Sequence, residues 1–331
     1  MPRVSIGLPV YNGEKYLRAA LDSLLGQDYG DFELIISDNA STDGTAGICQ
    51  EYVGKDRRIR YHRNDVNVGS ARNYNRVFEL ARGEFFKWAS HDDECHPTML
   101  RRCLETFEGG PPSLVLAYPQ ADIIDASGQV IDRAPDILRI GPGRPHQRLA
   151  RMLFKVQYGT PLWGLIRSDC LRKTRLMVGC IRNDFVLLAE IAMLGQSEEI
   201  PEVLFRLRKH PANATALWRD RRQLLIWCDP TQAKKRLLLP PTLGVILEVF
   251  RSIRHLPLPP ADKALCLATP LPTLIWRTIL RRSGPLRDQV GLHLKKTPGT
   301  HAGGAELSAQ PRKADGAKQA KSPGPARPQR N

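Results

Sequence analysis

Residues 84–97, EFFKWASHDDECHP, join an apolar run to a group of titratable side chains. The run at 85–88 is typical of a buried strand, and four titratable residues, 91–94, follow it directly. Two of them, Asp92 and Asp93, are adjacent carboxylates, which repel each other unless a positive charge lies beside them. The stretch therefore predicts a strand whose end requires a cationic partner.

The residues before this stretch alternate between strand-like and helix-like patterns. Strands are expected at 4–10, 32–37, 58–63 and 84–90, and helices at 14–27, 41–53 and 68–83. We expect the third helix to end at Gly83, with this glycine just past its C-terminus. Alternation at this spacing predicts an α/β fold, a mostly parallel sheet with helices on both faces.

Ligands of such sheets bind at the carboxyl ends of the strands. Three predicted strands end in polar residues, at 9–12, 37–39 and 91–93. If the sheet is parallel, these segments lie along one edge. Taken alone, each segment is better explained as a set of helix caps than as a ligand site, because Asp and Asn after a strand commonly cap helices.

Beyond residue 97 the pattern changes. A strand and hairpin are expected at 113–131, with the turn at Ser127-Gly128, then a helix at 182–195 and a strand at 202–210. Residues 216–296 are Leu-rich, and we expect helices there that are interrupted at 240–241 and at 257–260. Residues 297–331 contain almost no large apolar side chains and are expected to be disordered.

The net charge of +15 is unevenly placed. Residues 1–215 hold 28 basic and 27 acidic side chains, whereas 216–296 hold 15 basic and 5 acidic ones. A nucleic-acid-binding protein would not be neutral over its first two thirds. The basic segment indicates either a solvated helical face or attraction to an anionic membrane surface.

The seven cysteines are scattered, without a C-x-x-C pair, which argues against a disulfide framework and a zinc site. The first residues are too polar for a secretory signal, and no uninterrupted apolar run is long enough to span a bilayer. A cytoplasmic location is expected, with peripheral contact at the inner face of the membrane as the alternative.

Four segments together resemble family 2 glycosyltransferases of the inverting GT-A fold. They are SIGLPVYNGEKYLRAALDSLLGQ (5–27), ELIISDNASTDGT (33–45), NVGSARNYNRVFELARGEFFKWASHDD (67–93) and NDFVLLAEIAMLG (183–195). The resemblance covers roughly residues 3–215. It implies a nucleotide-sugar-binding half at 1–96 and an acceptor-binding half at 97–215, followed by a basic helical extension at 216–296 and a tail at 297–331.

The resemblance implies that the acidic motif binds a divalent metal, Mn²⁺ or Mg²⁺, which bridges the diphosphate of a nucleotide sugar. Oxygen ligands and an anionic substrate suit these cations. By position, Asp93 would hold the metal and Asp92 would face the ribose or sugar. His91 is expected to be an ordinary packed or solvent-facing histidine.

The resemblance also assigns residues to the donor and to catalysis. Asp184 would be the general base, because inverting transfer requires a group that deprotonates the acceptor hydroxyl. His210 would bind the metal or a phosphate, and either Arg206 or Arg208 is a candidate phosphate partner. The nucleotide-sugar contacts would be made by Pro9, Tyr11, Asn12, Glu14, Asp38, Asn67, Arg72 and Asp92.

The expected function is metal-dependent transfer of a sugar to a glycan, lipid-linked glycan or protein acceptor. The expected donor is a nucleotide sugar of the UDP-linked class. One alternative is nucleotidyl transfer, although PVYNGEKY (9–16) lacks the phosphate loop which that reaction usually needs. The other alternative is a non-catalytic module that binds nucleotide sugars. A panel of nucleotide sugars, tested with and without Mn²⁺, separates these three hypotheses.

Overall fold

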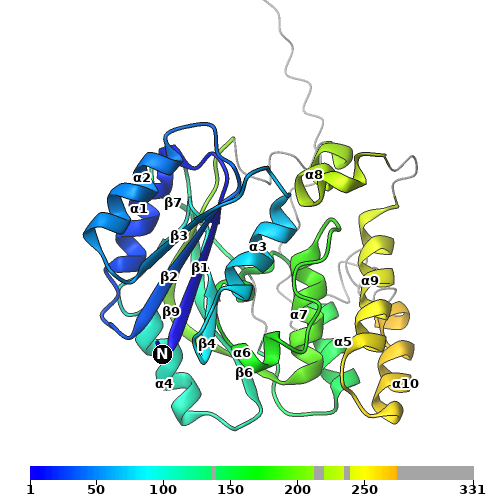
Figure 1. Ribbon diagram of the computed structural model, residues 1–331. Helices are drawn as coiled ribbons and strands as arrows, with labels where there is room; N and C mark the ends of the chain where they lie inside the picture. Colours follow the sequence, from blue (N-terminus) through cyan, green and yellow to red (C-terminus); the bar gives the residue numbers. More distant parts are fainter. Residues whose placement is uncertain (136–138, 212–219, 235–238, 274–331) are drawn as a thin grey trace, which may run out of the picture. The chain divides into compact units, whose positions relative to one another are not determined.

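The structure is a computed structural model that describes residues 1–135, 139–211, 220–234 and 239–273 (Figure 1). Strand and helix alternate in its first half, as predicted. The elements are β1 (Val4–Val10), α1 (Glu14–Leu25), β2 (Phe32–Asp38), α2 (Thr45–Lys55), β3 (Ile59–Arg63), α3 (Ser70–Glu79) and β4 (Phe85–Trp88). The four strands pair in parallel in the order β3-β2-β1-β4.

The second half extends the same sheet in the order β8-β6-β9-β5. β6 pairs in parallel with β9 and antiparallel with β8 and with β7, to which it is joined by the predicted turn at Ser127-Gly128. The elements are β5 (Glu94–Cys95), α4 (Met99–Gly109), β6 (Leu114–Ile124), β7 (Val130–Arg133), α5 (Pro145–Lys155), η1 (Thr160–Trp163), β8 (Leu165–Arg167), α6 (Ser168–Leu171), α7 (Asn183–Leu194) and β9 (Gln196–Arg208). The predicted α/β class, with a central sheet flanked by helices, is confirmed.

Each face of the sheet has its own hydrophobic core. Side chains alternate between the faces of a strand, so Phe85 of β4 packs in the core that contains residues of α1, α2 and α4. Phe86 and Trp88 pack in the other core, with residues of α3, α5 and α7 (Figure 1). Gly7 of β1 allows α3 to approach closely, because a Cβ there would lie 2.6 Å from the Val77 side chain.

The third helix ends earlier than predicted. α3 stops at Glu79, and Gly83 is not among the residues with a positive φ, so it is not the expected C-terminal glycine. A Cβ on Gly83 would lie 2.6 Å from the backbone nitrogen of Ser5. This glycine is therefore needed for the close approach of the chain to β1. The prediction that Gly83 ends the third helix was wrong.

Prolines begin two of the C-terminal helices, as the predicted interruptions suggest. The elements there are α8 (Arg221–Cys228), η3 (Pro230–Lys234), α9 (Pro241–His255) and α10 (Pro260–Ala268). α9 buries Val245, Val249 and Ile253 in the core that it shares with α7. Within the described residues, no helix combines the length and the apolar character that crossing a bilayer requires. The predicted tail at 297–331 lies outside the described residues.

Candidate active site

The carboxyl ends of β1, β2 and β4 meet at one edge of the sheet. Val10 of β1 is in register with Asp38 of β2, and Gly7 of β1 is in register with Trp88 of β4. The backbone N–H of Asn39 donates to the carbonyl of Val10 at 2.8 Å. The polar segments that follow these three strands are therefore neighbours, as a parallel sheet requires.

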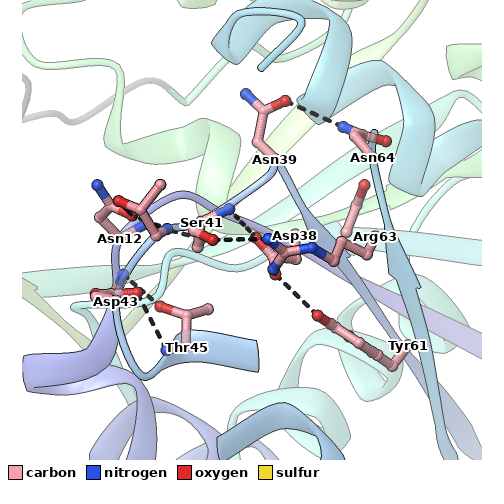
Figure 2. Close-up of polar contacts among 12 residues, drawn as sticks. Asn12, Asp38, Asn39, Ser41, Asp43, Thr45, Tyr61, Arg63 and Asn64 are labelled. Carbon is pink, nitrogen blue, oxygen red and sulfur yellow. Dashed lines mark hydrogen bonds and ion pairs between the residues drawn. The ribbon is translucent and has the colours of Figure 1, made fainter. Parts of the chain in front are cut away.

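Asp38 is fully buried, and both of its carboxylate oxygens accept hydrogen bonds (Figure 2). One oxygen accepts from the backbone N–H of Ser41 (2.8 Å). The other accepts from the Tyr61 hydroxyl (2.8 Å) and from Nη1 of Arg63 (2.7 Å). Burial, together with the bond to Asp38, raises the pKa of Tyr61 to about 12. A ligand that reaches Asp38 must share or displace the Arg63 guanidinium, and the nucleoside contact of Asp38 stays a prediction.

The loop after β1 is tied to the loop after β2. The backbone N–H of Asn12 donates to the Ser41 hydroxyl (2.9 Å), and Oδ1 of Asn12 accepts from the backbone N–H of Thr42 (2.8 Å). Oε2 of Glu14 accepts from the backbone N–H of Gly44 (2.9 Å). Asn12 and Glu14, both predicted donor contacts, thus also hold the shape of the loops.

The two other candidates of the first loop differ in exposure. Pro9 is buried within β1, whereas the Tyr11 side chain is 40% exposed at the strand end. Tyr11 is therefore placed where its ring can meet a ligand directly, and Pro9 shapes the strand end from within the sheet.

A network of asparagine amides joins the ends of β2, β3 and α3. Nδ2 of Asn39 donates to Oδ1 of Asn67 (2.8 Å), which also accepts from the backbone N–H of Gly69 (2.9 Å). Nδ2 of Asn64 donates to Oδ1 of Asn39 (3.0 Å) and of Asn73 (3.1 Å). Asn67 was predicted as a donor contact and Asn39 lies in a predicted polar segment, whereas the bonds that Asn64 and Asn73 supply to this edge were not predicted.

Arg72 lies on α3 and lines a pocket of about 280 Å³ along that helix. The other lining residues are Asn64, Val68, Asn75, Arg76 and Glu79. The charge of Arg72 helps to hold the pKa of Asp229 below its usual range, against the effect of burial and in addition to hydrogen bonds from Gln232 and Thr231. Arg72 therefore faces the segment after α8, and its nucleotide contact stays a prediction.

The acidic motif is buried and surrounded by polar partners. Nε2 of His210 lies 2.9 Å from Oδ2 of Asp92, and the Ser90 hydroxyl donates to the other Asp92 oxygen. The backbone N–H of Arg208 donates to Oδ1 of Asp93 (2.8 Å). The predicted metal residues Asp93 and His210 are thus brought together around Asp92.

The two carboxylates have opposite protonation tendencies. Burial acts to raise the pKa of Asp92, but His91, the Ser90 hydroxyl and His210 hold it below its usual range. Burial and the Asp92 charge raise the pKa of Asp93 well above its usual range. His91 is itself packed against Gly13, and burial lowers the pKa of its imidazole.

This donor set fits a hard divalent cation bound through carboxylate oxygens. A dication beside Asp92 and Asp93 would offset the repulsion that raises the pKa of Asp93. Among the described residues, no group of three or more His, Cys, Asp and Glu side chains is arranged so that it could hold a metal ion by itself. The remaining ligands would therefore be donor phosphate oxygens and water, as is usual for Mg²⁺.

Two buried cationic side chains support the acidic motif. The Arg208 guanidinium, 5% exposed, donates to the carbonyl of Asp92 (2.8 Å) and pairs with Glu94. Lys87 is 1% exposed and donates to the carbonyl of Trp163 (2.6 Å). The predicted strand pattern gave no sign that Lys87 points inward, because a lysine in an apolar run usually faces solvent.

Asp184 lies in the first turn of α7, two residues after Arg182, whose φ is 64°. Oδ2 of Asp184 would lie 2.5 Å from a Cβ at Gly159, where φ is 77°. Glycine is thus required at 159 both by its backbone conformation and by the carboxylate beside it. The approach of this loop to Asp184 could not be read from the sequence.

Tyr74 of α3 has a buried phenol whose pKa is affected by the charges of Asp184 and of the acidic motif. Burial raises the pKa of its phenol, and the charges of Asp92, Asp93 and Asp184 add to this effect. Tyr74 was not predicted to belong to the site, although it lies inside the segment 67–93 that carries the family resemblance.

Comparisons with known proteins agree with this arrangement. A sequence model of the family described as "Glycosyl transferase family 2" matches residues 5–161. An Escherichia coli K12 protein named as the colanic acid biosynthesis glycosyl transferase WcaA is 32% identical over 210 residues, which are 61% of this chain and 72% of that protein.

Two further relatives are longer than the matched region. A Bacillus subtilis 168 protein named as glycosyltransferase EpsH is 29% identical over 63% of this chain and 56% of its own. A Rickettsia typhi glycosyltransferase is 29% identical over 65% of this chain and 66% of its own. The chain thus spans 56% and 66% of the length of these two relatives.

Solved structures show the same fold at low sequence identity. Residues 1–349 of Staphylococcus aureus TarS, in complex with UDP-GlcNAc, match with a TM-score of 0.60 at 17% identity over 88% of this chain and 78% of that one. The mannosyltransferase PcManGT from Pyrobaculum calidifontis, in complex with GDP-Man and Mn²⁺, matches with a TM-score of 0.51 at 17% identity over 88% and 84%. The predicted GT-A fold is confirmed, and the chain belongs to glycosyltransferase family 2.

Proposed function

We propose that this protein transfers a sugar from a nucleotide sugar, in the first instance a UDP sugar, to a glycan, lipid-linked glycan or protein acceptor, with inversion at the anomeric carbon. The observation that carries the proposal is the buried pair Asp92 and Asp93 after β4, which His210 and the backbone N–H of Arg208 contact. Asp184, in the first turn of α7, would supply the acid on the acceptor side.

The reaction needs a base on the acceptor side and charge compensation on the donor side. Asp184 accepts the proton of the acceptor hydroxyl as that oxygen attacks the anomeric carbon, and the nucleotide diphosphate leaves from the opposite face. Asp92 and Asp93 would hold Mn²⁺ or Mg²⁺, which when bound offsets the charge of the leaving diphosphate. His210, next to Asp92, is placed to contact a phosphate or the metal.

The relatives support the donor and acceptor classes by analogy. TarS was solved with UDP-GlcNAc and PcManGT with GDP-Man and Mn²⁺, and WcaA is named for colanic acid biosynthesis. A role in cell-surface polysaccharide biosynthesis follows for this chain, with residues 1–96 binding the donor and residues 97–215 binding the acceptor.

We assign the basic extension at 216–296 a second task, peripheral contact with the anionic inner face of the membrane from the cytoplasmic side. Its helices pack on the rest of the fold with one face only. Several leucines remain 37–52% exposed: Leu239, Leu243, Leu247, Leu265, Leu267 and Leu271. Exposed leucines beside basic residues suit the headgroup region of an anionic bilayer.

A panel of nucleotide sugars tests the proposal. Wild-type protein is screened by calorimetry with and without Mn²⁺, and release of nucleoside diphosphate is then measured. Metal-dependent binding followed by diphosphate release supports sugar transfer. Binding without release by wild type would indicate a non-catalytic module, and pyrophosphate release from a nucleoside triphosphate and a sugar phosphate would indicate nucleotidyl transfer.

A further inference from the structure

The first turn of α1 reaches the acidic motif through a tyrosine that the proposed reaction does not use. Tyr16 lies in this turn, and the centroid of its ring is 4.7 Å from that of the His210 ring, with the two planes at 44°. Nε2 of His210 in turn contacts Asp92. We propose that Tyr16 is a positioning residue that holds His210 against Asp92, an inference that rests on the proposed function.

The same tyrosine ring lies against a second partner of the acidic motif. The guanidinium carbon of Arg208 is 4.9 Å from the centroid of the Tyr16 ring, which is within the range of a cation–π contact. Arg208 donates through its backbone N–H to Asp93 and through its guanidinium to the carbonyl of Asp92. One ring thus packs on Arg208 and on His210, two residues further along the chain.

The groups around the Tyr16 ring are shielded from solvent. The side chains of Arg208 and His210 are 5% and 7% exposed, and that of Asp92 is 10% exposed. Where water is excluded, a polar contact between an imidazole and a carboxylate is stronger than it is in bulk water. Removal of the ring would leave space beside His210 for the imidazole to turn away from Asp92.

The start of α1 contacts a second histidine of the motif. Gly13 directly precedes this helix, and a Cβ there would lie 2.8 Å from a ring carbon of His91. His91 and His210 are the two histidines beside Asp92, one next to it in the chain and one bonded to it across the sheet edge. A short segment of chain, Gly13 to Tyr16, therefore fixes both imidazoles.

The contacts of Tyr16 are made by its ring. The hydroxyl oxygen of Tyr16 is buried and has no hydrogen-bond partner among the described residues. A buried hydroxyl that makes no hydrogen bond is unfavourable, so Tyr16→Phe keeps the positioning contact and removes an unfavourable group. If the hydroxyl instead bound a phosphate of the donor, the same variant would lose affinity for the nucleotide.

NMR of the metal-free protein tests the contact between the two rings. The full chain, which has eight histidines, is prepared with isotope-labelled histidine, and His210→Ala identifies the His210 signal. Tyr16→Leu should move this signal, whereas Tyr16→Phe should leave it close to its wild-type position. The signal of His255, at the end of α9, should stay in place in both variants. An unmoved His210 signal in Tyr16→Leu would overturn the inference.

Calorimetry with UDP, with and without Mn²⁺, tests the positioning. Tyr16→Leu should weaken Mn²⁺-dependent UDP binding by about tenfold, and Tyr16→Phe should bind as wild type does. UDP affinity measured without Mn²⁺ should not change in either variant. A positioning residue acts through its partner, so Tyr16→Leu should have little further effect when it is combined with His210→Ala.

The outcomes separate this inference from the proposed function. Equal affinity of Tyr16→Leu and wild type, loss of affinity in Tyr16→Phe, or additive losses in the combined variant would overturn the positioning role and leave the proposed function standing. Failure of wild type to bind any nucleotide would instead contradict the proposed function. In that case the NMR comparison still decides whether the Tyr16 ring holds His210.

Discussion

Nε2 of His210, at the end of β9, lies 2.9 Å from Oδ2 of Asp92, at the end of β4. This contact connects two segments that are 118 residues apart in the chain. His91 and His210 favour the ionised form of Asp92. Burial and the negative charge of Asp92 then disfavour ionisation of Asp93 and raise its pKa. Asp93 is therefore the carboxylate that gains most from a bound dication.

Asp93→Ala is expected to abolish Mn²⁺-dependent binding of nucleoside diphosphate and to leave the fold intact. The physical reason is that the variant would lack a proposed metal ligand, while the carboxyl that it removes is buried and has a raised pKa, so its ionised form does not stabilise the metal-free protein. Calorimetry with UDP, with and without Mn²⁺, measures the effect. The idea fails if metal-dependent affinity is unchanged in Asp93→Ala.

Asp184→Asn is expected to bind the nucleotide sugar nearly normally and to lose transfer by on the order of 10²–10⁴-fold, the usual contribution of a general base. The amide keeps the shape beside Gly159 but cannot accept the proton. Asp169→Asn, at an exposed carboxylate in α6, is the matched control and should transfer at the wild-type rate. Retention of most of the transfer rate by Asp184→Asn would mean that another residue is the base.

The strands and the edge on which the polar residues gather were predictable because they depend on local pattern. Alternating strand and helix at βαβ spacing favours parallel strands, and parallel strands place their carboxyl ends together. The contribution of Gly83 was not predictable, because a close approach between backbones depends on tertiary packing. The same reason explains why the inward Lys87 and the contact of Gly159 with Asp184 were missed.

Site residues were predicted by position in a motif, and the structure adds what each one contacts. Motif position alone could not show that Arg63 pairs with the buried Asp38, since these residues lie on different strands. It also could not show that Asn67 is bonded to Asn39. Partners of this kind are set by strand register, which the sequence pattern does not specify to the residue.

Arg63→Gln is expected to lower the free energy of unfolding, because it leaves the buried Asp38 carboxylate without its cationic partner. Tyr61 and Ser41 retain their bonds to that carboxylate, which limits the loss. Urea unfolding measures the change. Arg133→Gln, which removes a surface pair with Asp122, is the control and should cost about 0.5 kcal/mol or less. Equal losses in the two variants would show that the pair of Arg63 with the buried Asp38 stabilises the fold no more than a surface ion pair does.

Glu190 of α7 makes stability depend on pH. It is fully buried, and burial raises its pKa to about 7, although Ser252 and Arg175 act in the opposite direction. Because the folded pKa lies above the unfolded value, folding favours the protonated carboxyl. The associated stability is complete below pH of about 4 and is lost as the pH rises through about 7.

Glu190→Gln is therefore expected to flatten the decrease in stability between acidic and alkaline pH. The wild type should lose roughly 2–3 kcal/mol more than this variant between about pH 5 and pH 8. Urea unfolding at several pH values measures the difference, and Glu84→Gln, at an exposed carboxylate, should run parallel to wild type. If stability depends on pH in the same way in wild type and in Glu190→Gln, the pKa of Glu190 is not raised in the folded protein.

The last prediction concerns the membrane. α9 and α10 supply Val245, Val249, Ile253 and Cys266 to the core, so deleting everything after residue 215 would disrupt the fold as well as any membrane contact. Substitution of the exposed leucines alone is the cleaner test. The combined variant Leu243→Ser, Leu247→Ser, Leu265→Ser and Leu271→Ser should keep the thermal midpoint, because these side chains are 39–52% exposed.

We expect wild type to sediment with vesicles of phosphatidylcholine and phosphatidylserine at low salt and to be released at high salt. Each basic residue near such a surface contributes about 1 kcal/mol, and salt screens that attraction. The fourfold variant should bind less, because it loses the apolar part of the contact. Val130→Ser with Ile131→Ser is the matched control, since it removes two exposed apolar side chains of β7. Equal binding of the fourfold variant and wild type, or binding that salt does not change, would contradict peripheral contact through these helices.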